Sequence, residues 1–389
     1  MKIAFCYESV LPARGGCETY ISDLARRLSV DNHEVHLYAC RWDPESLPSS
    51  VQVHLLPELH GPRFLRPWLF AASCARALRE EQNQITIGFD KTWGQDILYP
   101  QGGFHAASVG NNLLKYSSPF ARRLAGLCKK FDLAHWSFTA LERKQYREDD
   151  RSIVLVNSEM VRQHAIKFHG IDQERVRVLP NAIDPDRFAE PDRPRRRIEW
   201  RQRWGLRPED TVGLFVAMNY RLKGMEPLLH AVARLPRTTS FRLLIAGNPR
   251  FQAYERLARR LGIGDLVRFL GPRRDVHNCY FAADFLIHPT FYDPCSLVVL
   301  EGLACGLPIV TSRYNGASEL LHPPEDGFVI ENPHDHASLA DAIAGLLDPA
   351  TRSACSQAAR RAALRWNFGH HYRQLLLILN EVAARKRVA

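Results

Sequence analysis

Short apolar runs alternate with longer amphipathic stretches along most of this chain. The runs are rich in Val, Ile, Leu and Phe, as expected of strands buried on both faces. The strands that this pattern predicts are 2–7, 35–39, 51–56, 85–88, 96–99, 152–157 and 176–179, followed by 212–217, 241–246, 267–270, 285–288 and 309–311. Strands that alternate with helices in this way are typical of βαβ units and parallel sheets.

Helical periodicity fills the segments between the strands. The predicted helices are 17–28, 227–234, 251–261, 338–347 and the tail from Phe368 to Ala389. The segment from Asp184 to Pro208 is rich in Pro, Asp and Arg and has no apolar period, which predicts a domain linker.

The fold class predicted is α/β, with two Rossmann-like doubly wound domains that face each other across a cleft. A chain of 389 residues is too long for one ordinary core. We expect a first domain over 1–190 and a second over 191–367, with the C-terminal helix 368–389 packing back on the first.

Composition fits a cytoplasmic globular protein. Hydrophobic residues make up 46% and charged residues 24% of the chain, and no apolar run approaches the ~20 residues that span a bilayer. The opening residues reach an acid at Glu8, too early for a secretory signal, and predict a strand instead. The nine cysteines are scattered without a Cys-x-x-Cys pair, which favours reduced thiols over disulfides or zinc.

The net charge of +10 is unevenly distributed. No acid lies between Asp96 and Asp132, a stretch that contains the basic segment Lys115–Lys130, and a second basic segment runs from Arg193 to Arg207. Such surfaces favour anionic membranes or acidic substrates, although the second segment is better explained as a solvated charged face. No helix-turn-helix, zinc-finger or RNP-type motif is present, so we expect no nucleic-acid partner.

The most informative segment runs from His288 to Pro308. It places Asp293 in a polar loop and Glu301 eight positions later in an apolar run. Because a helix rises ~1.5 Å per residue, the two carboxylates would lie at different depths of one cleft. They could hold two hydroxyl-bearing parts of one ligand, such as the two sugars of a nucleotide-sugar. The alternative is a helix-capping Asp and a buried Glu.

Several other residues have both a functional and a structural interpretation. Gly15-Gly16, between a strand and a helix, could admit a phosphate or simply form a turn. Arg221 and Lys223 suit a diphosphate or surface ion pairs. His105 follows paired glycines and could approach a reacting centre, or serve as a capping or core histidine. Asp184-x-Asp186 is better explained by capping than by a metal, and we expect no metal site.

Together these segments resemble the family 4 retaining glycosyltransferases of GT-B fold, nearest to their lipopolysaccharide-core glucosyltransferase I branch. The matching motifs, spread over almost the whole chain, are Pro12-Ala13-Arg14-Gly15-Gly16, Val156-Asn157-Ser158, Leu179-Pro180-Asn181-Ala182-Ile183-Asp184, Arg221 with Lys223-Gly224, Asp293 to Glu301, and Ala304-Cys305-Gly306-Leu307-Pro308. The chain departs from the family pattern at Asp293, which replaces Glu, and at Ala182 and Ser296, which each replace Gly.

The resemblance implies a role for each matching residue. Glu301 would bind the donor ribose, Asp293 the transferred hexose and Lys223 the leaving diphosphate, while His105 would stabilise positive charge or orient the sugar on the acceptor side. The catalytic residues implied are His105, Lys223, Arg221 and Asp293. The donor-binding residues implied are Gly15, Gly16, Arg221, Lys223, Arg273, Asp293, Cys295, Ser296, Leu297, Val298 and Glu301.

The expected activity is therefore a metal-independent, retaining transfer of a hexose, glucose as the first candidate, from a UDP-sugar. The expected partners are the nucleotide-sugar donor, an anionic saccharide or glycolipid acceptor such as a lipopolysaccharide-core saccharide, and the cytoplasmic face of the inner membrane. No cofactor is implied. A nucleotide-sugar epimerase and a catalytically weak nucleotide-sugar-binding scaffold remain as alternatives.

Overall fold

The computed structural model describes residues 1–11, 15–58, 60–147, 151–188, 191–236 and 240–388, which form two compact units. The first unit comprises Met1–Leu113, Ser118–Pro180 and Tyr372–Ala389, and the second Leu114–Ser117 and Asn181–His371. The division after Pro180 falls ten residues before the predicted boundary at residue 190, which itself lies outside the described ranges. Most of the C-terminal helix belongs to the first unit.

The first unit is built on a seven-stranded sheet in the order β5-β3-β1-β6-β7-β8-β9, in which every pair is parallel. The strands are β1 (Lys2–Cys6), β3 (Glu34–Ala39), β5 (Gln52–Leu55), β6 (Ile85–Phe89), β7 (Ile97–Tyr99), β8 (Ile153–Val156) and β9 (Val176–Val178). Two short strands that the sequence did not predict, β2 (Ser9–Val10) and β4 (Arg41–Trp42), pair beside it.

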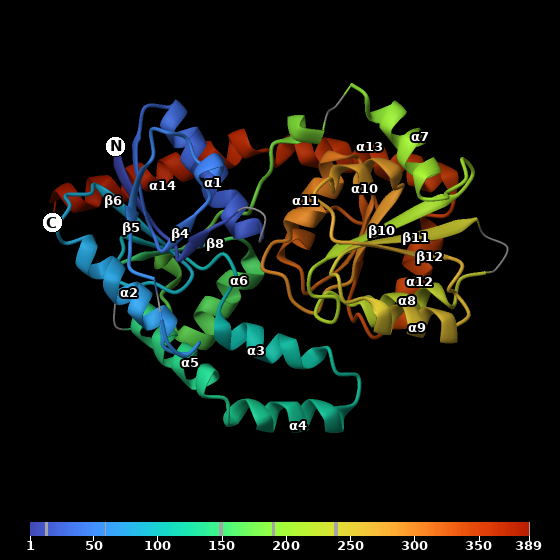
Figure 1. Cartoon of the computed structure of the whole chain (residues 1–389), viewed down its shortest axis with the longest axis horizontal. Helices are drawn as coiled ribbons and strands as arrows, with labels where there is room; N and C mark the ends of the chain where they lie inside the picture. The colour runs from blue at the N-terminus through green and yellow to red at the C-terminus, as the bar shows by residue number, and fades with distance from the viewer. Residues whose placement is uncertain (12–14, 59, 148–150, 189–190, 237–239, 389) are drawn as a thin grey trace. The chain divides into compact units, whose positions relative to one another are not determined.

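Helices cover both faces of this sheet (Figure 1). The helices of this unit are α1 (Gly16–Val30), α2 (Arg66–Ala77), α3 (His105–Leu114), α4 (Pro119–Lys130), α5 (Leu133–Tyr146), α6 (Glu159–His164) and α14 (Phe368–Val388). Of these, α4 contacts α5 and lies away from the sheet (Figure 1). Ion pairs hold α14 in the first unit, because Glu381 lies 3.1 Å from Arg177 on β9 and Lys386 lies 3.0 Å from Asp96.

The second unit contains a six-stranded parallel sheet in the order β12-β11-β10-β13-β14-β15. The strands are β10 (Thr211–Ala217), β11 (Phe241–Gly247), β12 (Val267–Gly271), β13 (Phe285–His288), β14 (Ile309–Ser312) and β15 (Gly327–Ile330). The helices are α7 (Arg193–Arg203), α8 (Met225–Val232), α9 (Gln252–Arg260), α10 (His277–Ala282), α11 (Leu297–Ala304), α12 (His336–Gly345) and α13 (Pro349–Arg365).

Alternate strand residues of this sheet feed two separate hydrophobic cores. Leu214 and Leu286 join the cluster that packs against α10, α11 and α13, whereas their neighbours Phe215 and Phe285 join the cluster against α8, α9 and α12. Successive strand side chains point to opposite faces, so a sheet covered by helices on both sides needs apolar residues at every position. The continuous apolar runs in the sequence reflect this double burial.

Strand order reverses once in each sheet, between β1 and β6 in the first unit and between β10 and β13 in the second. At such a reversal the flanking loops diverge, which leaves a crevice at the carboxyl ends of the two strands where ligands of open α/β sheets bind. The predicted fold class of two Rossmann-like α/β domains is confirmed. Within the described ranges, no helix is both long and apolar enough to cross a bilayer.

The predicted linker 184–208 was wrong, because a helix occupies about half of its described length. Residues Arg193–Arg203 form α7, which packs against α10. Its side chains Arg197 and Arg201 each bind Asp284 at 2.6 Å. Arginine stems can cover apolar surface while their guanidinium groups bind acids and helix-end carbonyls, so this helix needs no apolar period. Arg197 and Arg201 are therefore structural, whereas Arg195, Arg203 and Arg207 of the same basic segment are exposed.

Asp284 also accepts the N–H of Val212 at 2.7 Å, which makes it the hub of this helix–sheet contact. We expect Asp284→Ala to lower the free energy of unfolding by about 3–5 kcal/mol, because it leaves the buried Arg201 without its counter-ion. Urea unfolding of the whole chain measures this. The control is Glu209→Ala, which removes an exposed partner of Arg207 and should cost less than ~1 kcal/mol. Equal losses would contradict the prediction.

Candidate functional site

Two loops meet at the strand-order reversal of the second unit. One follows β10 and carries Lys223, and the other follows β13 and carries Asp293; the Lys223 ammonium lies 2.7 Å from the Asp293 carboxylate. Gly224 makes this approach possible, because its φ is +81° and a Cβ there would lie 2.0 Å from the carbonyl oxygen of Pro289. The structure thus brings together two residues that lie seventy positions apart in the sequence.

Asp293 is largely buried yet remains ionised. Burial alone would raise the pKa of its carboxyl group, but the charge of Lys223 and a contact with His288, whose Nε2 lies 3.4 Å away, outweigh burial and hold the pKa well below its usual range. Burial lowers the pKa of His288 itself, so its ring stays neutral. The site therefore presents one fixed cation and one fixed anion side by side.

Buried hydroxyl groups fix the β13 loop in place. Thr311 donates to the carbonyl of His288 at 2.8 Å, and Ser312 donates to the carbonyl of Thr290 at 2.5 Å. Lys223 also donates to the carbonyl of Tyr292 at 3.0 Å. A site held by buried hydrogen bonds loses little conformational freedom when a ligand arrives.

The loop leads directly into α11, whose first-turn amides lack intrahelical partners. The Ser296 amide already donates to the side chain of Asn315 at 3.2 Å, and the Cys295 carbonyl accepts from Asn181 at 3.0 Å. The amides of Leu297 and Val298 begin the helix. Four backbone amides, Cys295 to Val298, were predicted to hold the hexose. In this conformation the amide of Ser296 is already hydrogen-bonded to Asn315.

Glu301 lies one turn further along α11 and is partly buried beside Tyr280 of α10. The Tyr280 hydroxyl donates a hydrogen bond to its carboxylate. Burial raises the pKa of Glu301 to about 7, although the Tyr280 hydrogen bond and the charge of Arg187 oppose the shift. A carboxyl group with its pKa near neutrality in a ligand crevice is a frequent feature of binding and catalytic sites.

Two residues predicted to bind the nucleotide-sugar donor, Arg221 and Arg273, make no hydrogen bond or ion pair to Lys223, Asp293 or Glu301 among the contacts described. Arg221 is exposed on the β10 loop, two residues before Lys223. Arg273 binds Asp275 at 2.6 Å and lies 5.5 Å from the Trp200 ring, so its guanidinium group contacts α7. Asp184 accepts the N–H of Asp186 at 3.0 Å, the capping arrangement that the sequence favoured.

The remaining predicted residues belong to the first unit. Gly15 and Gly16 open α1, whereas the matching residues Pro12–Arg14 lie outside the described ranges. His105 opens α3, where its backbone N–H donates to Glu142, and its Nε2 lies 3.0 Å from His135. Burial lowers the pKa of His105 to about 4, so the ring is neutral near pH 7.

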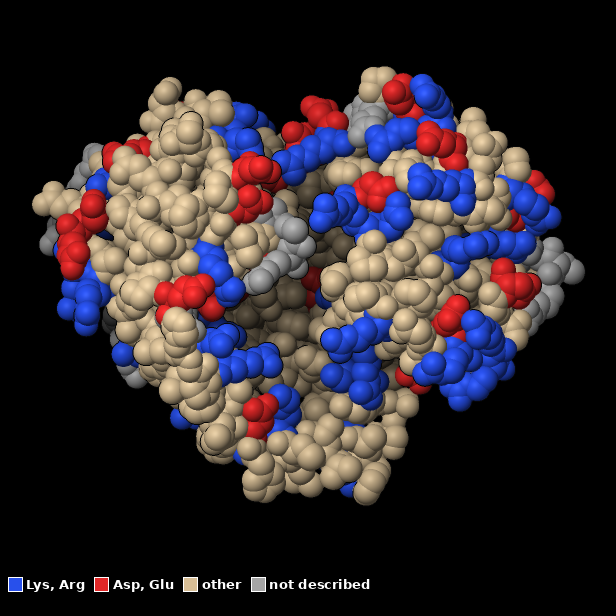
Figure 2. Space-filling view, in the orientation of Figure 1, with Lys and Arg blue, Asp and Glu red and all other residues tan. Residues whose placement is uncertain are grey.

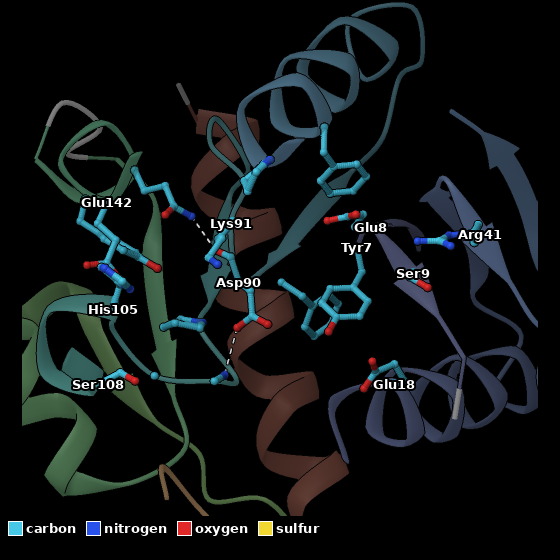
Figure 3. A pocket seen from close by; sticks show the side chains of 18 residues that line it. Tyr7, Glu8, Ser9, Glu18, Arg41, Asp90, Lys91, His105, Ser108 and Glu142 are labelled. Atoms are coloured by element: carbon cyan, nitrogen blue, oxygen red, sulfur yellow. Dashed lines mark hydrogen bonds between the residues drawn. The ribbon is translucent and has the colours of Figure 1, made fainter. Parts of the chain in front are cut away.

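His105 lines a pocket of about 420 Å³ at the strand-order reversal of the first sheet (Figure 3). Tyr7 and Asp90, which follow β1 and β6, reach into this pocket from the carboxyl ends of their strands. Burial raises the pKa of Asp90, while the N–H of Gly102, a donor at 3.0 Å, and the charge of Lys91 partly offset the rise. Each unit therefore has polar, charged groups at its own reversal.

Sequence reasoning assigned no role to Asp90, Glu142, Tyr280 or His288. Asp90 and His288 could have been suspected, because each stands at the end of an apolar strand, where ligand-binding residues of parallel sheets gather. Tyr280 gave no such signal, since it lies in an apolar helical stretch. Among the described residues, no cluster of three or more His, Cys, Asp or Glu side chains could hold a metal ion.

Comparisons with known proteins agree with this architecture. A family model described as glycosyl transferases group 1 matches residues 196–362, and one described as glycosyltransferase family 4 matches residues 14–187. The chain belongs to the GT-B glycosyltransferases of group 1, with an N-terminal domain of the family 4 type.

Particular relatives match over nearly the full length. The chain is 24% identical to the lipopolysaccharide glucosyltransferase WaaG of Escherichia coli K12, over 95% of this chain and 94% of that protein. It is 30% identical to a D-inositol 3-phosphate glycosyltransferase of Acidothermus cellulolyticus, over 96% of this chain and 87% of that protein.

Solved structures show the same fold. The crystal structure of WaaG matches with a TM-score of 0.79 at 23% identity, covering 97% of this chain and 99% of that one. Anabaena Alr3699/HepE in complex with UDP-glucose matches with a TM-score of 0.72 at 19% identity, covering 98% of this chain and 100% of that one.

The raised pKa of Glu301 predicts a pH-dependent stability. Its value of about 7 in the fold exceeds the ordinary value of 4.5, so the native state binds this proton more tightly than the unfolded chain. The corresponding stabilisation is complete below pH 4.5 and is lost as the pH rises through 7. Glu301→Gln cannot titrate, and its stability relative to the wild type should rise by about 2–3 kcal/mol between pH 4.5 and pH 8.

Urea unfolding at several pH values measures this difference. Glu255→Gln, at an exposed position on α9, controls for the loss of a negative charge as such. A gap between Glu301→Gln and the wild type that stays constant across this pH range would contradict the assignment.

Proposed function

We propose that this chain transfers a hexose, glucose being the first candidate, from a UDP-sugar to a lipid-linked or lipopolysaccharide-core saccharide, with retention at the anomeric carbon. The observation that carries the proposal is the Lys223–Asp293 pair at the strand-order reversal, with Glu301 on the helix that follows. WaaG is a lipopolysaccharide glucosyltransferase by name, and the HepE complex contains UDP-glucose, which supports this donor.

In this proposal the residues of the second unit divide the donor between them. Glu301 accepts the ribose hydroxyls, and Asp293 with the first amides of α11 holds the hexose. Lys223, assisted by Arg221, stabilises the negative charge that develops on the departing diphosphate. Such preorganised charges act at the transition state without having to reorganise.

Fixed cations and helix amides take the place of a metal ion in this proposal. The leaving phosphate oxygen accepts the proton from the acceptor hydroxyl as the new glycosidic bond forms, so the reaction needs no dedicated base. In the first unit, the neutral ring of His105 orients the sugar on the acceptor side. The amides of Gly15 and Gly16 are proposed as further donors to the diphosphate.

We further propose that α4 binds the cytoplasmic face of the inner membrane. Its apolar side chains Phe120, Leu124 and Leu127 are 75%, 52% and 53% exposed, and Phe131 just beyond it is 85% exposed. The lower margin of Figure 2, where Figure 1 places α4, is formed mainly by uncharged residues. Exposed apolar residues beside Lys and Arg are typical of helices that lie in the surface of an anionic bilayer.

Replacing Lys223 tests the donor assignment. We expect Lys223→Gln to lower turnover of UDP-glucose by roughly 100-fold or more, because one preorganised charge at the leaving group is lost. The measurement is UDP release with a panel of nucleotide-sugars, alongside thermal unfolding to show that the variant is folded. Lys167→Gln, at an exposed position of the first unit that does not line its pocket, serves as the matched lysine control. Unchanged turnover in Lys223→Gln would remove the phosphate role, and activity abolished by a chelator would contradict the metal-free reaction.

Vesicle binding tests the membrane proposal. Leu124→Ser combined with Leu127→Ser should weaken binding to vesicles that contain phosphatidylglycerol at least ~10-fold, because two apolar side chains no longer leave water. The control combines Leu364→Ser and Leu377→Ser, two leucines that are 57% and 63% exposed on α13 and α14. Added salt should weaken wild-type binding. Equal effects of the two pairs, or binding insensitive to salt, would contradict the role of α4.

A further inference from the structure

The pocket of the first unit contains one residue in an unusual backbone conformation. Asp90 has a φ of +56°, in the left-handed region that side chains other than glycine rarely adopt. Three hydrogen bonds hold it there: its N–H donates to Tyr99, its carbonyl accepts from Gln145, and its carboxylate accepts from Gly102. Non-glycine residues held in this way are concentrated at ligand sites.

This conformation directs the Asp90 carboxylate into the pocket, as Figure 3 shows. The aromatic rings of Tyr7 and Phe89 line the pocket beside it. A volume of about 420 Å³ falls in the range of small-molecule sites. A carboxylate next to flat aromatic surface suits a sugar ring, which has hydroxyl groups on its edge and C–H groups on its faces.

The charges around the pocket are predominantly negative. Among the described residues, the lining contains four carboxylates, Glu8, Glu18, Asp90 and Glu142, against the cations Lys91 and Arg41. Lys91 lies with its ammonium 3.8 Å from the centroid of the Phe138 ring, which already engages part of its charge. His105 adds no positive charge near pH 7.

Glu142 has a structural role, and its negative charge still counts among the acids that line the pocket. Its carboxylate accepts the first N–H groups of α3 and lies 3.3 Å from His169. A phosphate group would bring nearly two negative charges into a partly open pocket where, among the described lining residues, acids outnumber bases, and like charges repel.

We propose that this pocket binds an uncharged, hydroxyl-bearing ring of the acceptor and discriminates against a phosphorylated ring, with Asp90 accepting hydrogen bonds from the ring hydroxyls. The inference rests on the proposed transferase function and narrows its substrate class. Any anionic group of the acceptor then lies outside this pocket. The chain would differ here from D-inositol 3-phosphate glycosyltransferases, whose name specifies a phosphorylated polyol.

Matched pairs of small ligands test this inference on the full-length protein. The probes are glucose with glucose 6-phosphate, and inositol with inositol 3-phosphate, measured by ligand-observed NMR titration at physiological salt. We expect the uncharged member of at least one pair to bind roughly 10-fold tighter than its phosphate. Asp90→Asn should weaken the uncharged ligand roughly 10-fold, because it loses a hydrogen bond to a charged acceptor, and should narrow the gap to the phosphate.

Glu80→Gln, at an exposed position of the first unit that does not line the pocket, controls for charge removal in general. Tighter binding of both phosphates, binding of none of the four probes, or equal effects of Asp90→Asn and Glu80→Gln would overturn the inference. Donor binding is followed separately with UDP-glucose. If UDP-glucose binds while the phosphates are preferred, the pocket inference fails and the transferase proposal stands; if UDP-glucose does not bind, the transferase proposal itself fails.

Discussion

The reversal of strand order in each parallel sheet is the constraint on which the rest of this structure depends. Parallel strands all end at one edge, and only at the reversal do neighbouring loops turn away from each other and leave room for a ligand. In the second unit this places Lys223 against Asp293, and in the first it places Asp90 beside Tyr7. The strand order of each sheet therefore determines where the charged groups of that unit lie.

Much of this arrangement is encoded in patterns that can be read directly. Every predicted strand is present, because strands buried on both faces are continuous apolar runs, as the paired cores around Leu214 and Phe215 show. The Lys223 and Asp293 segments were identified because loop residues after strands carry polar chemistry. The strand order could not be read in the same way, since parallel pairing joins segments that lie far apart in the sequence.

Other features depend on three-dimensional partners and leave no local signal. Helix α7 has almost no apolar period, and it forms because Asp284, more than eighty positions away, pairs with two of its arginines. The hydrogen bond from Tyr280 to Glu301 joins two helices that lie about twenty positions apart in the sequence, and no local pattern marks the two residues as partners. The same holds for the conformation of Asp90, which Gln145 and Gly102 fix from other elements. Tertiary hydrogen bonds, rather than propensity, decide these positions.

The Lys223–Asp293 pair also bears on how a donor would enter. Without a ligand the two charges compensate each other, which avoids leaving either one isolated in a largely enclosed crevice. In the proposed reaction the diphosphate supplies a stronger anion for Lys223, and hydroxyl groups of the hexose can then donate to Asp293. The site exchanges one internal ion pair for two contacts to the same ligand. Because the two contacts fall on different parts of the donor, a nucleotide lacking its sugar would satisfy Lys223 and leave Asp293 without a new partner, which favours the intact nucleotide-sugar.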